Sequence, residues 1–171
     1  VFPGILGRVC DRPCEPACRR SRVEEKPVAI CRLKRVAADH RDDVSALLPK
    51  APPQFNGKRI ALVGAGPASL TVANDLRPLG YEVTIFEALG TTGGLMRTNI
   101  PQFRLPPDVL DEEIGYILDM GVDLHLNHRI ESMKELLDEG YDAIFVGTGA
   151  PKGKNLEIPG RYDSDRIHIG I

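Results

Sequence analysis

Two glycines and a glutamate have the residue types and the spacing to bind a dinucleotide. Gly64 and Gly66 come directly after the apolar run Ile60–Val63, and Glu87 follows after about 20 residues, where an acidic group holds a ribose 2′-OH. Glycine lets the chain turn tightly and lets backbone approach a pyrophosphate, which the amino end of the next helix attracts. The carboxylate of Glu87 would repel a 2′-phosphate, so we do not expect this site to bind the adenosine end of NADP. Its first part is Gly64, Ala65, Gly66, Pro67 and Ala68.

The elements around these residues have the order of a βαβ unit. Apolar and β-branched runs, separated by segments with helical periodicity, predict an α/β fold. We expect a Rossmann-like parallel sheet of about four strands with flanking helices, preceded by a small helical cysteine-rich segment. The predicted strands are Ile60–Val63, Tyr81–Phe86, Val122–Leu126 and Tyr141–Val146, and the predicted helices are Val28–Asp39, Leu70–Leu79, Pro107–Met120 and Ser132–Glu139.

The glycine motif departs from its usual pattern at its last position. Ser69 replaces the third glycine of G-x-G-x-x-G, where only a small residue fits between helix and strand. Serine is small enough to be accepted there, with a slight displacement of the helix. The alternative is a doubly wound domain whose glycine turn holds no ligand.

Two further glycine-rich turns are expected at the same edge of the sheet. Gly93, Gly94 and Leu95 follow the second strand, and Gly147, Thr148, Gly149 and Ala150 follow the fourth. Ligands of open α/β sheets bind outside the carboxyl ends of the strands, so converging turns predict an extended cofactor that also contacts Thr148 and Gly149. Arg104, in a segment Ile100–Pro106 predicted to be extended, could bind a phosphate. An ordinary flexible loop is the alternative for residues 88–96.

Cysteines near the amino end suggest metal chemistry. Cys10, Cys14 and Cys18 are spaced four residues apart with prolines between them, and soft thiolates suit iron–sulfur clusters or zinc. Inert thiols, or disulfides in a secreted protein, are the alternatives. Cys31 is interpreted as a packed thiol in an amphipathic helix. We expect that helix to bury Val28, Ile30, Leu33, Val36 and Ala37. His125 and His128 form only a weak metal pair, and a surface position is favoured.

Composition narrows the class of protein. The 171 residues carry a net charge of −2 and are 42% hydrophobic, which fits a globular protein and gives no sign of a nucleic-acid or anionic-membrane partner. No apolar stretch is long enough to span a bilayer, so a cytoplasmic location is expected. The chain lacks an initiator Met and is interpreted as part of a longer protein. We predict four parts: an iron–sulfur segment 1–44, a linker 45–57, a nucleotide-binding domain 58–151 and a tail 152–171.

Taken in order, five motifs resemble one family nearly end to end. They are Gly-Arg-Val-Cys-x3-Cys-x3-Cys, Pro27–Ile30, Val63–Ala68, Gly93–Leu95 with Ile100–Pro106, and Gly147–Ala150. This order resembles the glutamate synthase small (β) subunit and the same module in dihydropyrimidine dehydrogenase. The resemblance implies FAD, with Gly64–Ala68 on the pyrophosphate and Glu87 on the adenosine ribose. It implies that the flavin is lined by Gly93, Gly94, Leu95 and Arg104, with peripheral contacts from Val9 and Ile130.

The same resemblance implies a role for the parent protein. Cys10, Cys14 and Cys18 match ligands of two 4Fe–4S clusters, and an NAD(P)H-binding domain would follow Ile171. Electrons would pass from NAD(P)H to FAD and through clusters to a larger, electron-accepting partner subunit. No side chain is predicted to act as catalytic acid or base. Two rival interpretations are an NAD-binding dehydrogenase domain and a non-catalytic docking module for a partner subunit.

Overall fold

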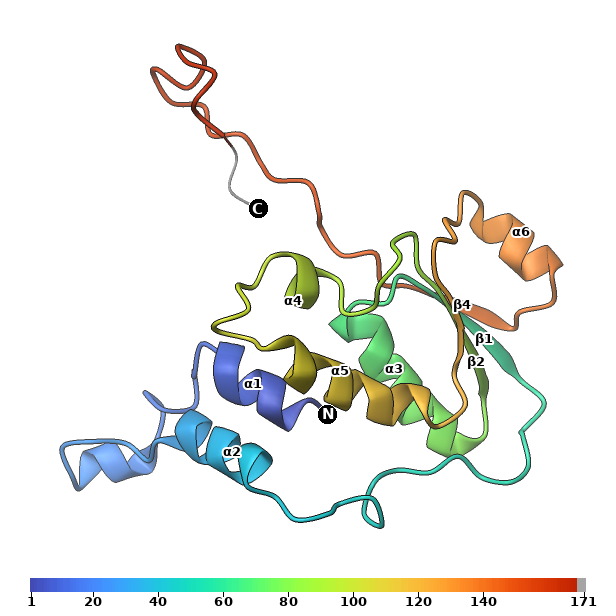
Figure 1. The fold of residues 1–171 in the computed structure, drawn as a ribbon, viewed down its shortest axis with the longest axis horizontal. Coiled ribbons are helices and arrows are strands. Elements are labelled where there is room, and N and C mark those ends of the chain that lie inside the picture. Colours follow the sequence, from blue (N-terminus) through green and yellow to red (C-terminus); the bar gives the residue numbers. More distant parts are fainter. Residues whose placement is uncertain (169–171) are drawn as a thin grey trace.

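The apolar runs that follow Lys58 and Tyr81 form the central strands of a parallel sheet. In the computed structural model, which describes residues 1–168, β1 (Arg59–Val63) pairs with β2 (Glu82–Phe86) in parallel. The short strand β3 (Asp123–His125) pairs with β2, and β4 (Ala143–Val146) pairs with β1. The strand order is β3-β2-β1-β4 (Figure 1), which confirms the predicted α/β class and four-stranded parallel sheet. The end of the predicted tail, residues 169–171, lies outside the described residues.

Helices connect these strands and cover both faces of the sheet (Figure 1). Proline at the first helical position and glycine in the left-handed region after the last turn set several of their ends. None of the helices in residues 1–168 combines the length and the apolar character needed to cross a bilayer. The helices are α1 (Pro3–Val9), α2 (Ile30–Asp39), α3 (Pro67–Leu76), α4 (Leu95–Thr98), α5 (Pro107–Leu118) and α6 (Met133–Asp138), with 3-10 turns at Arg19–Arg22 and Arg77–Leu79.

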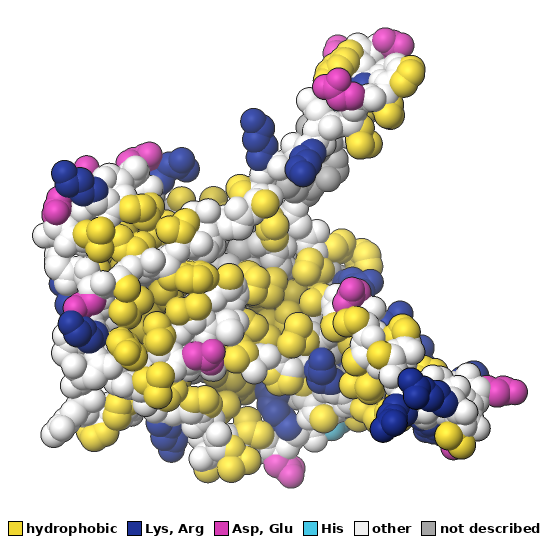
Figure 2. Space-filling model, turned by 180° about the vertical axis from the view of Figure 1, so that it is seen from behind, with side chains coloured by type: hydrophobic (Ala, Val, Ile, Leu, Met, Phe, Trp, Pro, Cys, Tyr) yellow, Lys and Arg dark blue, Asp and Glu magenta, His cyan; other side chains and the backbone are white. Residues whose placement is uncertain are grey.

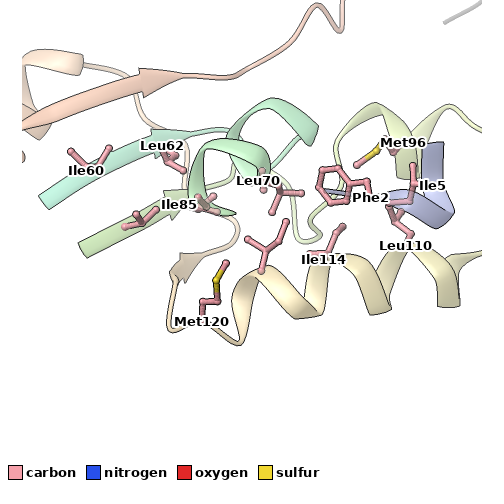
Figure 3. Close-up of a cluster of buried hydrophobic side chains, with 14 of the residues drawn as sticks. Phe2, Ile5, Ile60, Leu62, Leu70, Ile85, Met96, Leu110, Ile114 and Met120 are labelled. Atoms are coloured by element: carbon pink, nitrogen blue, oxygen red, sulfur yellow. The ribbon is translucent and has the colours of Figure 1, made fainter. Parts of the chain in front are cut away.

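Side chains along each strand point alternately to the two faces of the sheet, and the core is therefore divided into two hydrophobic clusters. Ile60 and Leu62 of β1 face one side, where they join residues of α3 and α5 (Figure 3). Ala61 and Val63 face the other side, where α6 packs through Leu136. Side chains of a strand alternate between the faces of its sheet, so both faces of β1 are buried. The carboxyl ends of the strands are thereby fixed relative to one another.

The amino-terminal helix is part of the larger cluster. Phe2 and Ile5 are buried against Met96, Leu110 and Ile114 (Figure 3). The segment 1–44 thus shares a hydrophobic core with the nucleotide-binding fold. Its division from the rest of the chain as a separate domain stays a prediction.

Apart from shifts of one or two residues at most element ends, two local predictions differ from the structure. Helix α3 begins at Pro67 rather than Leu70, because Gly66 supplies its extended N-cap and proline is favourable in the first turn. The segment Ile100–Pro106 was predicted to be extended, which is wrong. The N–H groups of Arg104 and Leu105 both donate to the carbonyl of Pro101, at 2.9 and 3.1 Å, and form a turn. The fixed φ of proline suits a turn as well as an extended chain.

The predicted buried face of α2 is also wrong. Leu33 and Val36 are 58% and 55% exposed, while Cys31 and Ala38 are buried. Helix α1 comes very close to α2, because a Cβ on Gly7 would lie only 2.8 Å from the Cα of Arg35. Such a close contact admits small side chains and leaves no room for leucine or valine. The small-residue face of α2 therefore packs inward.

Candidate functional site

The glycine turns after β1 and β4 lie in direct contact. Gly64 has a φ of +98°, and its N–H donates to the carbonyl of Phe86 at 2.7 Å. A Cβ on Gly64 would lie 2.6 Å from the carbonyl oxygen of Gly147, which real Cβ atoms do not tolerate. Glycine is required at this position both by backbone conformation and by the neighbouring strand. The convergence of the two turns, predicted because both follow the carboxyl ends of strands, is confirmed.

Gly66 is different, because nothing in the fold requires it to be glycine. Its φ of −80° and ψ of 178° are open to any residue. A Cβ there would meet no atom nearer than the carbonyl oxygen of Gly147, at 3.9 Å. Among residues 1–168 its N–H has no hydrogen-bond acceptor. The space in front of Gly66 is open, and it lies at the amino end of α3, where the backbone is positively polarised.

The loop after β2 closes over this space from a third side. The N–H of Gly93 donates to the carbonyl of Ala65 at 2.8 Å, which ties the loop to the first turn. Gly94 has a φ of +52°, and a Cβ on it would lie 3.0 Å from the Cα of Gly66. Three glycine-rich stretches thus lie close together around Gly66, and we call them the glycine cradle: residues 64–68, 93–95 and 147–149.

Glu87 is buried beneath the cradle. Its side chain accepts a hydrogen bond from the N–H of Ala65 at 2.7 Å and another from the N–H of Leu89 at 2.8 Å, one on each carboxylate oxygen. The residue is 8% exposed. A carboxylate oxygen has more than one acceptor direction, so both oxygens keep capacity for a hydroxyl. The arrangement fixes the carboxylate at the edge of the sheet where a ribose was predicted.

Ser69 fits because Gly147 leaves room for it. Its side chain is fully buried, and its Oγ has no hydrogen-bond partner among the described residues. A Cβ on Gly147 would lie 2.2 Å from that Oγ. Serine therefore fits in place of the third glycine because Gly147, directly after β4, has no side chain.

Other predicted contacts lie around the cradle or away from it. Thr148 and Gly149 are exposed directly after β4, and Leu95 is a partly exposed first residue of α4. Arg104 is exposed in its turn. Val9 packs against the larger hydrophobic cluster and Ile130 against the smaller one. These residues stay predicted cofactor contacts.

The cysteines of the amino-terminal segment are separately placed. Cys10 caps the end of α1, Cys14 is exposed, and Cys18 precedes a 3-10 turn. Nowhere in residues 1–168 do three His, Cys, Asp or Glu side chains gather as possible metal ligands. These residues therefore do not fit a cluster as a preformed set. Hydrogen bonds from the backbone N–H groups of Val28 and then Arg20 lower the pKa of the Cys18 thiol, which favours thiolate.

Cys31 and the two histidines behave as the sequence predicts. Cys31 is buried, with its Sγ 3.4 Å from the carbonyl oxygen of Leu6, as expected of a packed thiol. His125 and His128 are exposed and pack on Phe86, with ring centroids 5.2 and 5.0 Å away. A surface position is confirmed for both.

Sequence reasoning missed the role of three consecutive acidic residues in α5. Asp111 binds Arg97, whose Nε donates to the carbonyl of Thr92 at 2.7 Å and so braces the loop of the cradle. Glu112 binds Arg41, and Glu113 binds the backbone of α1. Acidic residues near the amino end of a helix are expected from the helix dipole alone and so indicate no particular partner. A sharper signal was available, because Glu113 lies between Leu110 and Ile117 on the apolar face.

Fold and cradle together define a Rossmann-like nucleotide-binding domain. Residues 62–139 match the family described as an NAD(P)-binding Rossmann-like domain. The chain is 38% identical to the NADP(+)-dependent formate dehydrogenase subunit beta of Moorella thermoacetica, over 94% of the chain and 26% of that protein. It is 34% identical to the glutamate synthase (NADPH) small chain of Bacillus subtilis, over 99% of the chain and 34% of that protein.

A third relative is named as a subunit of a dehydrogenase. The chain is 36% identical to the NAD-dependent dihydropyrimidine dehydrogenase subunit PreT of Salmonella typhimurium, over 90% of the chain and 38% of that protein. The resemblance to the glutamate synthase small-subunit family is thus confirmed. The chain spans about a quarter to two fifths of the length of these three relatives, each of which is named as a subunit or chain of a dehydrogenase or a synthase.

Proposed function

We propose that this chain binds FAD in the glycine cradle and forms the flavin-binding part of an NAD(P)H-dependent oxidoreductase subunit. The observation that carries this proposal is Gly66. Backbone conformation and packing would both accept a side chain there, so a ligand that approaches the backbone explains the glycine best. The confirmed resemblance to oxidoreductase subunits supports the same assignment.

Each part of the cradle would have its own task. Backbone N–H groups of residues 64–68 would bind the pyrophosphate, and Glu87 would accept hydrogen bonds from the adenosine ribose. The outer lining would come from Gly93, Gly94, Leu95, Arg104, Thr148 and Gly149, with Val9 and Ile130 at the periphery. A bound flavin would supply hydride and electron chemistry, while the chain supplies position and electrostatics.

For the parent protein we infer electron transfer from NAD(P)H to a larger partner subunit, as in a glutamate synthase β subunit, in the cytoplasm. The relatives are named as subunits or as a small chain, which supports a partner. Large hydrophobic side chains also remain exposed, including Phe103 at 91%. Figure 2 shows hydrophobic side chains gathered across the middle of one face, and such surfaces are typical of interaction sites.

The cysteines are proposed as iron–sulfur ligands on the resemblance alone. Cys10, Cys14 and Cys18 have suitable thiols, but the described residues do not bring three ligands together. The cofactor proposal for FAD does not depend on them.

NAD in the same cradle is the second candidate function. The matching family is described as NAD(P)-binding, and Glu87 would bind an NAD ribose as well as that of FAD. Equilibrium titrations of the chain with FAD, NAD and NADP separate the candidates. We expect FAD to bind tightest, with its visible flavin absorbance retained after desalting. Tighter binding of NAD would favour the rival, and binding of no nucleotide would favour a docking module.

A matched pair of glycine substitutions tests the cradle itself. Gly66→Ala should weaken FAD binding by about tenfold or more while leaving the urea midpoint unchanged, because its Cβ meets only the ligand. Gly64→Ala should instead lower the free energy of unfolding by about 2 kcal/mol or more, since its φ and the carbonyl of Gly147 both exclude a side chain. Unchanged FAD affinity in Gly66→Ala would contradict the proposal.

A further inference from the structure

A buried carboxylate joins the cysteine-bearing segment to the nucleotide-binding fold. Glu113 of α5 is 4% exposed. One of its oxygens accepts a hydrogen bond from the N–H of Gly4 at 2.6 Å and the other from the N–H of Ile5 at 3.1 Å. Charged hydrogen bonds are stronger than neutral ones, and a buried carboxylate is tolerated only when it is so bonded. The two backbone N–H groups and the carboxylate therefore satisfy one another.

Helix α1 has no other cap at its amino end. Its N-cap residue, Phe2, has a left-handed φ of 58° and gives no side-chain hydrogen bond. The first N–H groups of a helix need an external acceptor, and Glu113 is that acceptor. The side chain of Phe2 is then free to enter the core beside Ile5.

This connection places the first cysteine. Helix α1 ends at Val9 with Cys10 as its C-cap, so the direction of the helix determines where the cysteine loop begins. On its other side α1 contacts α2 through Gly7. Helix α5 holds the glycine cradle as well, because Asp111 binds the arginine that braces the loop after β2. One helix thus locates both the cysteine segment and the cradle.

We propose that Glu113 is a positioning residue that holds the cysteine-bearing segment at a fixed place relative to the nucleotide-binding site. The importance of that place for electron transfer rests on the proposed function, whereas the positioning itself does not. The carboxylate oxygens of Glu113 accept hydrogen bonds from backbone N–H groups of α1 and not from residues of the glycine cradle. Changing Glu113 should therefore move the cysteine segment, and Val9 at the end of α1 with it, while the glycine turns themselves keep their places.

A distance measurement between two nitroxide labels tests this proposal. One label is placed on Cys10, and the other on α6 at the exposed position Lys134, which is changed to cysteine. The full chain also carries Cys14→Ser and Cys18→Ser, so that these thiols are not labelled. Cys31 is kept because it is buried. In Glu113→Gln only one of the two hydrogen bonds can persist, so we expect the pulsed-EPR distance distribution to become roughly twice as broad. Asp119→Asn is the matched control and should leave the distribution unchanged, because Asp119 lies exposed at the C-cap of α5 and its side chain bonds to no group in the described residues.

A second variant perturbs the same contact from the other partner. A Cβ on Gly4 would lie 2.9 Å from the Oε1 of Glu113, so Gly4→Ala should displace the carboxylate and broaden the distribution too. Hydrogen exchange of β1 checks that the sheet stays folded, and Gly4→Ala decides the result if Glu113→Gln does not fold. Distributions as narrow as in the parent chain for both variants would overturn the positioning role. Failure of the parent chain to bind FAD would overturn the proposed function alone.

Discussion

At the scale of single residues, the cradle shows which glycines serve the fold and which serve a ligand. Gly64 and Gly147 are needed because neighbouring atoms occupy the place of a side chain, while Gly66 faces open space. A glycine pattern in the sequence cannot make this distinction, because it depends on what lies opposite each residue in space. The sequence did predict which residues meet at this edge, since the carboxyl ends of parallel strands come together.

Ser69 and Gly147 should behave as a coupled pair. Ser69→Ala removes a fully buried, unpaired hydroxyl and should change the free energy of unfolding by less than about 1 kcal/mol. Gly147→Ala should destabilise by about 2–3 kcal/mol, because its Cβ would meet the Oγ of Ser69. The double variant should recover part of that loss, since Phe145 remains 2.9 Å from the new Cβ. Urea unfolding of all four chains measures the coupling, and strictly additive changes would refute it.

Glu87 should govern both nucleotide affinity and stability, because in Glu87→Gln only one of its two backbone hydrogen bonds can persist. Glu87→Gln removes the charge that a ribose hydroxyl would bond to, and we expect about a tenfold or larger loss of FAD affinity in equilibrium titration. Glu82→Gln is the matched control, as that glutamate lies on the same strand, away from its carboxyl end. Equal affinities for FAD in the two variants would count against a ribose contact.

At the scale of elements, predictability followed local signals. Helix α5 could be predicted because prolines, acids and a terminal glycine mark its ends. The buried face of α2 could not, because periodicity favours Leu33 and Val36, and only the close approach of α1 selects Cys31 and Ala38. The partners of the acids in α5 are tertiary contacts with distant segments, so no local pattern reveals them.

The tie between α5 and the segment that follows α2 should depend on pH. The hydroxyl of Tyr116, donating at 2.7 Å, and then the guanidinium of Arg41 lower the pKa of Glu112 below its usual value. A carboxyl whose pKa is lower in the folded state stabilises the fold above the unfolded pKa of about 4.3, and this stabilisation disappears as the pH falls through the folded pKa.

We therefore expect the stability difference between the parent chain and Glu112→Gln to be present at neutral pH. It should shrink progressively as the pH falls below about 4. Urea unfolding of both chains across this range measures the difference. A stability difference that stays constant from neutral to acid pH would show that protonation of Glu112 is not linked to folding.

At the scale of the whole molecule, the tail stands apart from the fold. It runs away from the sheet after β4 (Figure 1), and in its described part the hydrogen bonds join only tail residues to one another. Removal of residues 152–171 should leave the thermal midpoint and the FAD affinity of the chain unchanged. A drop in either would show that the predicted nucleotide-binding domain, 58–151, extends into the tail.

The overall topology followed from the sequence, whereas the integration of its amino-terminal segment did not. The parallel four-stranded sheet was predicted from apolar runs separated by helical segments and glycine turns, which are local features. The contact of Glu113 with Gly4 joins residues 109 positions apart. Composition and periodicity carry no record of such a contact.

The consecutive acids of α5 have a consequence for insertions and deletions. Adjacent helical residues point about 100° apart, so Asp111, Glu112 and Glu113 reach three different partners around one helix axis. One alanine inserted after Val109 would bring Asp111 to the position of Glu112 and Glu112 to that of Glu113, and it would push Glu113 into the buried apolar position of Ile114. The three acids together therefore fix the rotation of α5 about its own axis. Insertions and deletions in the preceding turn should be tolerated only before Pro107.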